Sequence, residues 1–294
     1  MPSVYEVITQ RIIQQLEAGT APWHKPWKAR GKNGLPRNLV SGREYRGINV
    51  WILLSSGYAS PQWLTFRQAR ELGGHVRQGE SGFPVVYWKF GTREIQDGDE
   101  IIEKKSVLCR YYILFNEEQC ADLRVRPARP LEDSPQIGPI EACEEVVSGW
   151  HARPVIHHHG DAASYNKVTD IVQMPNRSCF DGSEEYYSTL FHELVHSTGH
   201  PGRLNRSTLM DFERFGDEIY SREELVAEMG AAFLAGYCGI ENRTINNSAA
   251  YLASWLEALK NDHRMVLIAA SQAQKAADLI RGVAHINHTQ EAVA

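Results

Sequence analysis

His192, Glu193 and His196 form the spacing His-Glu-x-x-His, which combines two metal-binding side chains with an acid. On a helix, His192 and His196 lie one turn apart on the same face and can offer two imidazoles to one metal ion. Such an ion polarises a carbonyl and acidifies a bound water, and Glu193 lies beside it as the base that accepts the proton. The residues between and before the histidines are apolar, which predicts a buried helix. Unpaired buried imidazoles would cost about 1–3 kcal/mol each, so a metal site is favoured over a purely structural helix.

The site needs a third ligand. In the arrangement HExxHxxGxxH the third histidine would fall at Gly202, and His200 lies beyond the predicted end of the helix, so this arrangement is excluded. The segment REELVAE instead resembles the gluzincin arrangement, with Glu224 and Glu228 four residues apart on one helical face. We assign Glu224 as the third metal ligand, with Glu228 as the alternative ligand or as the carboxylate that orients a ligand histidine. Two nitrogens and one carboxylate suit Zn²⁺ best, followed by other divalent ions such as Mn²⁺.

The N-terminal third is basic and rich in tryptophan. Residues 1–93 hold five of the seven tryptophans and 13 Lys or Arg against 5 Asp or Glu, whereas residues 127–294 hold 13 basic and 23 acidic residues. Proteins bind single-stranded nucleic acid with cationic grooves that follow phosphates and with aromatic faces that stack on bases. Trp51 and Trp88 lie among aliphatic residues, so we expect them in the core. The expected DNA-binding residues lie mainly on the Pro-rich loop 20–38: Trp23, Lys25, Trp27, Lys28, Arg30, Lys32, Arg43 and Arg46.

The hydrophobic pattern predicts an α+β chain of two domains. Prolines interrupt residues 124–139, so we predict domains over residues 1–123 and 140–294 joined by a linker over 124–139. In the first domain we expect helices over 5–18, 45–57 and 65–74, and a hairpin of strands 83–90 and 106–116. The second domain is predicted to be mainly helical. Its expected elements are helices over 139–150, 184–198, 247–261 and 264–280, a helix after Ser221 as N-cap, and strands within 153–160 and 170–175.

Composition excludes several classes of protein. No apolar run approaches the roughly 20 residues of a transmembrane helix, and the N-terminal residues do not have the pattern of a signal peptide. The five cysteines are odd in number and form no CxxC pair, which favours reduced thiols in the cytoplasm. No P-loop, dinucleotide fingerprint or GxSxG motif occurs. The tract His157–His159 is expected to be structural, because consecutive strand residues point to opposite sides.

Taken together, these segments resemble a known family. The stretches YNKVTDIVQMP, SEEYYSTLFHELVHSTGHPGRLNR and SREELVAEMGAAFL resemble the zincin-like metallopeptidase domain of ArdC-type antirestriction proteins from conjugative plasmids. VITQRIIQQLEAGTAPWHKPW, YRGINVWIL, WLTFRQARELGGHVRQGESGFPVVYW and YYILFN resemble that family's N-terminal single-stranded-DNA-binding domain, which is shared with TraC-type plasmid primases.

The resemblance implies single-stranded DNA as a partner, and protection of incoming plasmid DNA from restriction during conjugation. If the metallopeptidase domain has a protein substrate, a host restriction component is one candidate. For the site it implies His192 and His196 as ligands, Glu193 as base, and residues 170–175 as the strand at the edge of the active-site cleft. It leaves open whether hydrolysis of a host protein contributes to protection.

Overall fold

The computed structural model describes residues 3–19, 21–23, 35–97, 100–124, 138–210, 218–240 and 249–283. The predicted linker lies almost wholly outside these residues. Within them the chain has the predicted α+β composition, and no helix combines the length and the hydropathy needed to cross a bilayer. The N-terminal elements are α1 (Val4–Glu17), β1 (Arg37–Asn38), α2 (Ile48–Leu54), β2 (Gln62–Thr65), α3 (Phe66–Glu71), β3 (His75–Val76), β4 (Phe83–Asp97), β5 (Glu100–Asn116), the 3-10 turn η1 (Glu117–Gln119) and β6 (Cys120–Ala121).

The first helix begins at a capping box. The Ser3 hydroxyl accepts a hydrogen bond from the Glu6 N–H at 3.2 Å, and the Glu6 carboxylate accepts one from the Ser3 N–H at 2.6 Å. Ile8, Ile12 and Leu16 recur at helical spacing and are buried. The sequence therefore determines both the start of α1 and the face by which it packs.

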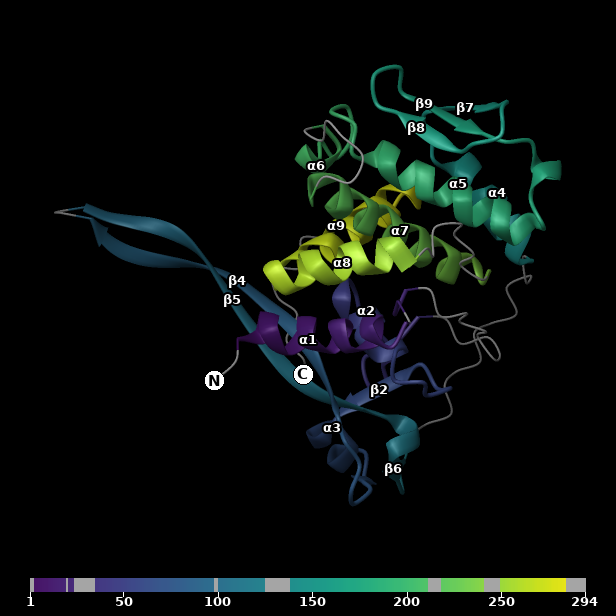
Figure 1. The fold of residues 1–294 in the computed structure, drawn as a ribbon. Coiled ribbons are helices and arrows are strands. Elements are labelled where there is room, and N and C mark those ends of the chain that lie inside the picture. The colour runs from purple at the N-terminus through teal and green to yellow at the C-terminus, as the bar shows by residue number, and fades with distance from the viewer. Residues whose placement is uncertain are drawn as a thin grey trace.

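The N-terminal sheet has the strand order β1-β2-β5-β4, and its main feature is a long hairpin. Strands β4 and β5 pair antiparallel from Phe83 opposite Leu114 to Asp97 opposite Glu100, so both extend beyond the predicted spans. Residues 91–105 are mostly polar in sequence, and the hydrophobic pattern therefore ends before the backbone pairing does. Figure 1 shows the outer part of this hairpin projecting away from the rest of the molecule.

The C-terminal part places helices against a small sheet of order β7-β9-β8 (Figure 1). Strand β9 is central, parallel to β7 and antiparallel to β8. The strand β8, which lies in a turn-rich stretch, was not predicted from the sequence, and the helix predicted after Ser221 begins earlier than expected. The elements are α4 (Pro139–Gly149), β7 (Val155–His158), β8 (Ser164–Asn166), β9 (Ile171–Met174), the 3-10 turn η2 (Arg177–Cys179), α5 (Ser183–Thr198), α6 (Ser207–Met210), α7 (Glu218–Cys238), α8 (Ala249–Asn261) and α9 (Met265–Ile280).

Ser221 is not the N-cap of α7. The helix begins three residues earlier, at Glu218, so Ser221 lies inside it. The Ser221 hydroxyl is 2.8 Å from the hydroxyl of Ser254 on α8. This contact between helices takes the place of the predicted capping bond.

Two glycines allow the helices around α5 to approach closely. A Cβ at Gly230 of α7 would lie 2.7 Å from the side chain of Val195 on α5, closer than packed atoms approach. A Cβ at Gly199, which follows α5, would lie 2.9–3.0 Å from the side chains of Leu209 and Arg206. Both glycines therefore bring other segments up to the helix that carries the two histidines.

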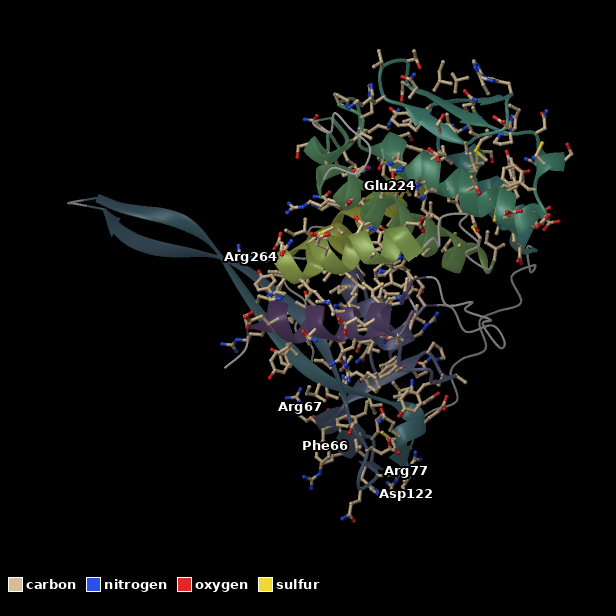
Figure 2. All side chains as sticks on the ribbon, in the orientation of Figure 1. Phe66, Arg67, Arg77, Asp122, Glu224 and Arg264 are labelled. Atoms are coloured by element: carbon tan, nitrogen blue, oxygen red, sulfur yellow. The ribbon has the colours of Figure 1, made fainter. Side chains whose placement is uncertain are left out.

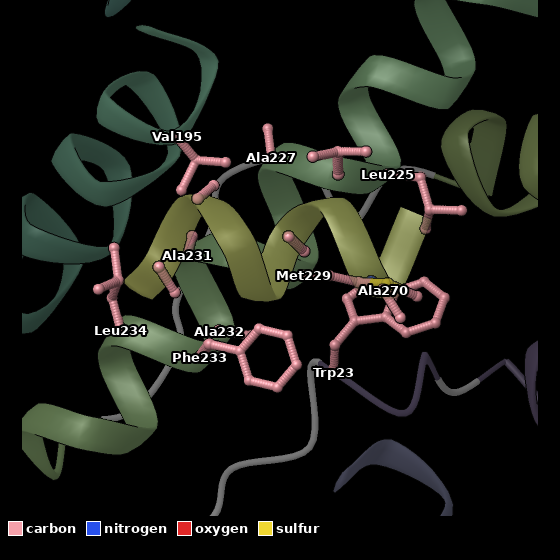
Figure 3. Packing of buried hydrophobic residues seen from close by; sticks show 14 of the residues in the cluster. Trp23, Val195, Leu225, Ala227, Met229, Ala231, Ala232, Phe233, Leu234 and Ala270 are labelled. Atoms are coloured by element: carbon pink, nitrogen blue, oxygen red, sulfur yellow. The ribbon is translucent and has the colours of Figure 1, made fainter. Parts of the chain in front are cut away.

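The two halves of the chain share one hydrophobic core. Trp51 of α2 lies with its ring 4.5 Å from that of Phe233 on α7, and Trp23 lies 5.6 Å from Trp255 on α8. Figure 3 shows Trp23 among the residues of α7 and α9 in this cluster. Polar contacts cross the same boundary, since Arg46 pairs with the buried carboxylate of Asp278. The halves are thus joined by extensive packing, and we expect neither to keep its core when separated from the other.

Candidate metal centre

His192, His196 and Glu224 converge in the helical half of the molecule, where Figure 2 labels Glu224. The two imidazole Nε2 atoms are 3.0 Å apart. One Glu224 oxygen lies 3.4 Å from Nε2 of His192, and the other lies 3.3 Å from Nε2 of His196. All three side chains are buried. The structure thus brings together the three residues that the sequence predicts as ligands.

The spacing of these donor atoms fits one small cation. Ligand atoms at 2.0–2.2 Å from a tetrahedral ion lie about 3.4 Å from one another. The observed separations of 3.0, 3.3 and 3.4 Å are close to this value. Two facing ring nitrogens without a cation must share a proton, whereas a bound divalent ion satisfies both. When bound, such an ion would act as a Lewis acid toward a carbonyl and a water.

Each histidine is also held from behind by a carboxylate. Glu228 lies 3.5 Å from Nδ1 of His192, a distance typical of an electrostatic contact rather than a strong hydrogen bond. Glu223 lies 3.3 Å from Nδ1 of His196. Carboxylates in this position orient the ring and make it a better ligand. Glu228 therefore lies where the sequence analysis allowed for a supporting residue, on the side of His192 away from Glu224.

Glu223 belongs to the candidate centre but was not predicted from the sequence. It is fully buried and forms an ion pair with the buried guanidinium of Arg206. Thr208 also donates a hydrogen bond of 2.6 Å to the same carboxylate. The only sequence signal was that the segment REELVAE contains Glu223 in addition to the two acids considered as ligands. The partner Arg206 lies 17 residues away, and no local rule joins the two.

The carboxylates and imidazoles set each other's ionisation. Burial by itself would lower the pKa of both histidines, but the surrounding carboxylates outweigh burial and raise it, most strongly for His196. Burial would likewise raise the pKa of Glu224, yet the two histidines hold it well below its usual range. The pKa of Glu223 falls to about 2, because His196 and Arg206 overcome the effect of burial. The centre therefore holds its two nearest carboxylates ionised.

Glu193 is buried beside the two candidate ligand histidines, on the same helix. Burial raises its pKa, opposed by the charges of His192 and His196 and by a hydrogen bond from the Tyr165 backbone. A carboxylate with a raised pKa is suited to accepting and returning a proton near neutral pH. The arrangement thus provides a proton acceptor next to the three candidate ligands.

The strand beside Glu193 is not the one inferred from the sequence. Residues 170–175 include β9, which is the central strand, paired on both sides. The hydrogen bond to Glu193 comes from Tyr165 of β8, and β8 is an outer strand of this three-stranded sheet. Only tertiary pairing distinguishes an outer from a central strand when both are short.

Glu223→Gln tests the role of this carboxylate as a positioning residue. We expect affinity for a divalent metal to fall about 10- to 100-fold, because the neutral amide no longer holds the ring of His196. The unpaired Arg206 should also lower the free energy of unfolding by about 3–5 kcal/mol. Competition with a chelating dye measures the affinity, at a temperature where the metal-free variant is folded. Asp170→Asn is the control, since Asp170 pairs with Arg203 and does not contact either histidine. Equal affinities for the two variants would contradict this role.

Not all of the residues predicted to contact DNA are free to do so in the structure. Trp23 is fully buried, so its indole has no face available for a base, and the expectation of a nucleic-acid contact there is wrong. The loop was too irregular for its packing to be read from the sequence. Arg46 forms its ion pair with Asp278, and Arg43 is exposed. Five of the expected residues lie outside the described part of the chain: Lys25, Trp27, Lys28, Arg30 and Lys32.

The sequence singled out four other histidines, which lie in the tract 157–159 and at His200. His158 on β7 is 2.8 Å from the hydroxyl of Tyr186, and the rings of His157 and His159 are 6.4 Å apart. His200 follows the end of α5 and accepts a hydrogen bond from the Gly202 N–H at 3.1 Å. Neither the tract nor His200 belongs to the group of donor atoms that converges at the centre within the described residues.

Two family models match the chain, one in each half. Residues 141–272 match a zincin-like metallopeptidase, and residues 2–115 match the N-terminal domain of the anti-restriction factor ArdC. Two proteins of Escherichia coli named DNA primase TraC are 36% and 34% identical over 94% of this chain, which spans only 27% and 20% of their lengths. An uncharacterized protein y4eC of Sinorhizobium fredii (strain NBRC 101917 / NGR234) is 36% identical, with 94% of this chain and 90% of that protein covered.

Solved structures match over almost the whole chain. The crystal structure of the antirestriction protein ArdC from the R388 plasmid, in its metal-free form, is 38% identical and superposes with a TM-score of 0.74. It covers 96% of this chain and 98% of that one. The Mn(II)-bound form of the same protein has a TM-score of 0.73 at 38% identity and covers 97% and 100% of the two chains.

Proposed function

Because the chain belongs to the family of ArdC antirestriction proteins, we propose that it binds single-stranded DNA and protects incoming plasmid DNA from host restriction during conjugation. The observation that carries the proposal is the match of residues 2–115 to the N-terminal domain of ArdC. The surplus of basic residues in that part of the chain supports it, because phosphate contacts dominate the affinity for nucleic acid. Lys25, Trp27, Lys28, Arg30 and Lys32 remain proposed contacts. We place this activity in the cytoplasm, where restriction enzymes meet incoming DNA.

The second part of the proposal is a divalent metal held by His192, His196 and Glu224. The buried triad and the Mn(II) bound in the relative from R388 both support a divalent ion. Two imidazoles and a carboxylate are compatible with Zn²⁺ or Mn²⁺, and Zn²⁺ is our first choice from the donor set.

A second candidate function is peptidase activity toward a host protein, such as a restriction component. Glu193 favours it, because a purely structural metal site needs ligands but no proton acceptor. The outer strand β8 favours it too, because an extended peptide can pair with the edge of a sheet. We place DNA binding first, since covering a strand needs only a basic aromatic surface, whereas proteolysis also needs a recognised target.

Glu193→Gln in the full-length chain separates the two functions. We expect protection in a restriction assay to persist at the wild-type level, because the amide removes the proton acceptor without removing a ligand. Metal content, affinity for single-stranded DNA and melting temperature are measured on the same preparation. Loss of protection with these three unchanged would make hydrolysis essential and would favour the peptidase. The full chain is required because the halves share a core.

A further inference from the structure

Exposed apolar side chains gather at the C-terminal end of β5. Tyr111 and Ile113 are 47% and 41% exposed, and alternation along the strand puts them on the same face as Phe115. Phe66, the first residue of α3, is 52% exposed, and its ring lies 6.4 Å from that of Phe115. We call Tyr111, Ile113, Phe115 and Phe66 the β5 stripe. Exposed apolar residues gathered in one place on a protein surface mark an interaction site.

A groove adjoins the β5 stripe. Pro84 of β4 is the cross-strand partner of Ile113, so the two side chains lie next to each other on one face of the hairpin. Pro84 also lines a cleft of about 570 Å³, whose other walls are α1 and His263 in the turn between α8 and α9. The Thr9 hydroxyl donates a hydrogen bond of 2.6 Å to the His263 carbonyl and so holds this turn against α1. The stripe and the groove therefore meet at the pair of Pro84 and Ile113, and the groove itself lies between α1 and a turn of the C-terminal half.

The groove is lined by Arg11, one guanidinium nitrogen of which lacks an acceptor within the described residues. Nη1 of Arg11 is buried and has no hydrogen-bond partner within the described residues, and Cζ of Arg11 lies 4.8 Å from the ring centre of Phe83. A buried donor without an acceptor destabilises the protein, and a bound anion would supply the acceptor. Among the described residues that line the groove, the only acid is Glu6, which already accepts the capping hydrogen bond from Ser3. The groove therefore offers a cation whose remaining donor an anionic ligand can fill.

Further cationic groups lie along the other end of the stripe. Arg67 and Arg70 follow Phe66 on α3 and are exposed, and Figure 2 shows Phe66 and Arg67 at the end of the molecule opposite Glu224. Arg67 lies 3.3 Å from the Glu71 carboxylate. Such an exposed ion pair contributes little to stability, so Arg67 can exchange Glu71 for another anion. The stripe and the groove, taken together as one track, thus have guanidinium groups at both ends and exposed apolar side chains between them, a combination typical of a single-strand binding surface.

We propose that the β5 stripe and the groove beside α1 form the binding track for single-stranded DNA, with a phosphate at Arg11 and bases stacked on Tyr111 and Phe66. The inference rests on the proposed function and assigns it to residues that the sequence did not indicate. Duplex DNA is disfavoured, because its bases are already stacked on each other. An apolar protein segment is disfavoured by the unsatisfied guanidinium and by the arginines at both ends.

The test measures binding of a fluorescein-labelled 20-residue oligo(dT) to the full-length protein by fluorescence anisotropy. Tyr111→Leu should weaken binding about 5- to 100-fold, because an aliphatic side chain cannot stack on a base. Arg11→Gln should also weaken binding. The slope of log Kd against log salt concentration should fall by about 0.7, because one phosphate contact is lost. Tyr112→Leu is the matched control on the opposite face of the same strand, and Arg153→Gln is an exposed arginine in the acidic half. Both controls should bind as the wild type does.

The outcomes separate the proposed function from the track. A wild-type protein that does not bind oligo(dT) overturns the proposed function, and the track with it. Wild-type binding that Tyr111→Leu and Arg11→Gln both leave unchanged overturns the track alone. If Tyr111→Leu lowers the melting temperature, Phe66→Leu replaces it as the stacking variant. Tighter binding of oligo(U), or self-association that Tyr111→Leu abolishes in sedimentation, assigns the stripe to RNA or to a second copy and also overturns the proposal.

Discussion

Replacing Glu224 with alanine is expected to weaken divalent-metal binding by more than about 100-fold, because the variant loses one of the three proposed ligands, whereas loss of a supporting carboxylate costs about 10- to 100-fold. Among the described residues, Glu224 is the acid whose two oxygens face the Nε2 atoms of both histidines. Affinities for Zn²⁺ and Mn²⁺ are measured by competition with a chelator, and bound metal is quantified after gel filtration.

Glu228→Ala is the matched control for this prediction. It removes the same side chain one turn along α7, but its carboxylate contacts Nδ1 of His192 and not the face shared with His196. We therefore expect the smaller loss, about 10- to 100-fold. Circular dichroism checks that both variants are folded without metal. If Glu228→Ala lost more metal affinity than Glu224→Ala, Glu228 would be the ligand and Glu224 the supporting carboxylate.

Replacing Trp51 with alanine should lower the free energy of unfolding by about 3–5 kcal/mol. Its indole is fully buried and packs on Phe233, so the truncation leaves a cavity where the two halves meet. Urea unfolding is followed by tryptophan fluorescence and by far-UV circular dichroism. Since the core is continuous, we expect the two signals to change in one transition that shifts as a whole.

Trp88→Ala is the control, because Trp88 is only partly buried and packs against Tyr5 within the N-terminal half. It should cost less than Trp51→Ala. Two separate transitions, with only one shifted by Trp51→Ala, would contradict a shared core. The same reasoning applies to Trp23: a Trp23→Ala variant that loses DNA binding would report lost stability, because the native indole is inaccessible.

Local patterns in the sequence were enough to predict most helices and the identity of the candidate ligands. His192 and His196, like Glu224 and Glu228, are four residues apart, and a helix places such residues on one face whatever it packs against. The apolar periodicity of α1 and α5 and the hairpin of β4 and β5 are local in the same sense. Each of these features depends only on residues that are close together in the chain, so it can be predicted from a single sequence.

Contacts between distant segments were decided only by the tertiary structure. Whether Glu224 or Glu228 faces both Nε2 atoms depends on the approach of α7 to α5 at Gly230, and the support of His196 by Glu223 depends on Arg206. The order of the small sheet makes β8 the strand beside Glu193, and packing between the halves buries Trp23. Residue types and local spacing determined which groups can bind metal or stack on bases. Long-range packing decided which of them meet and which remain accessible, because burial and pairing depend on partners far away in the chain.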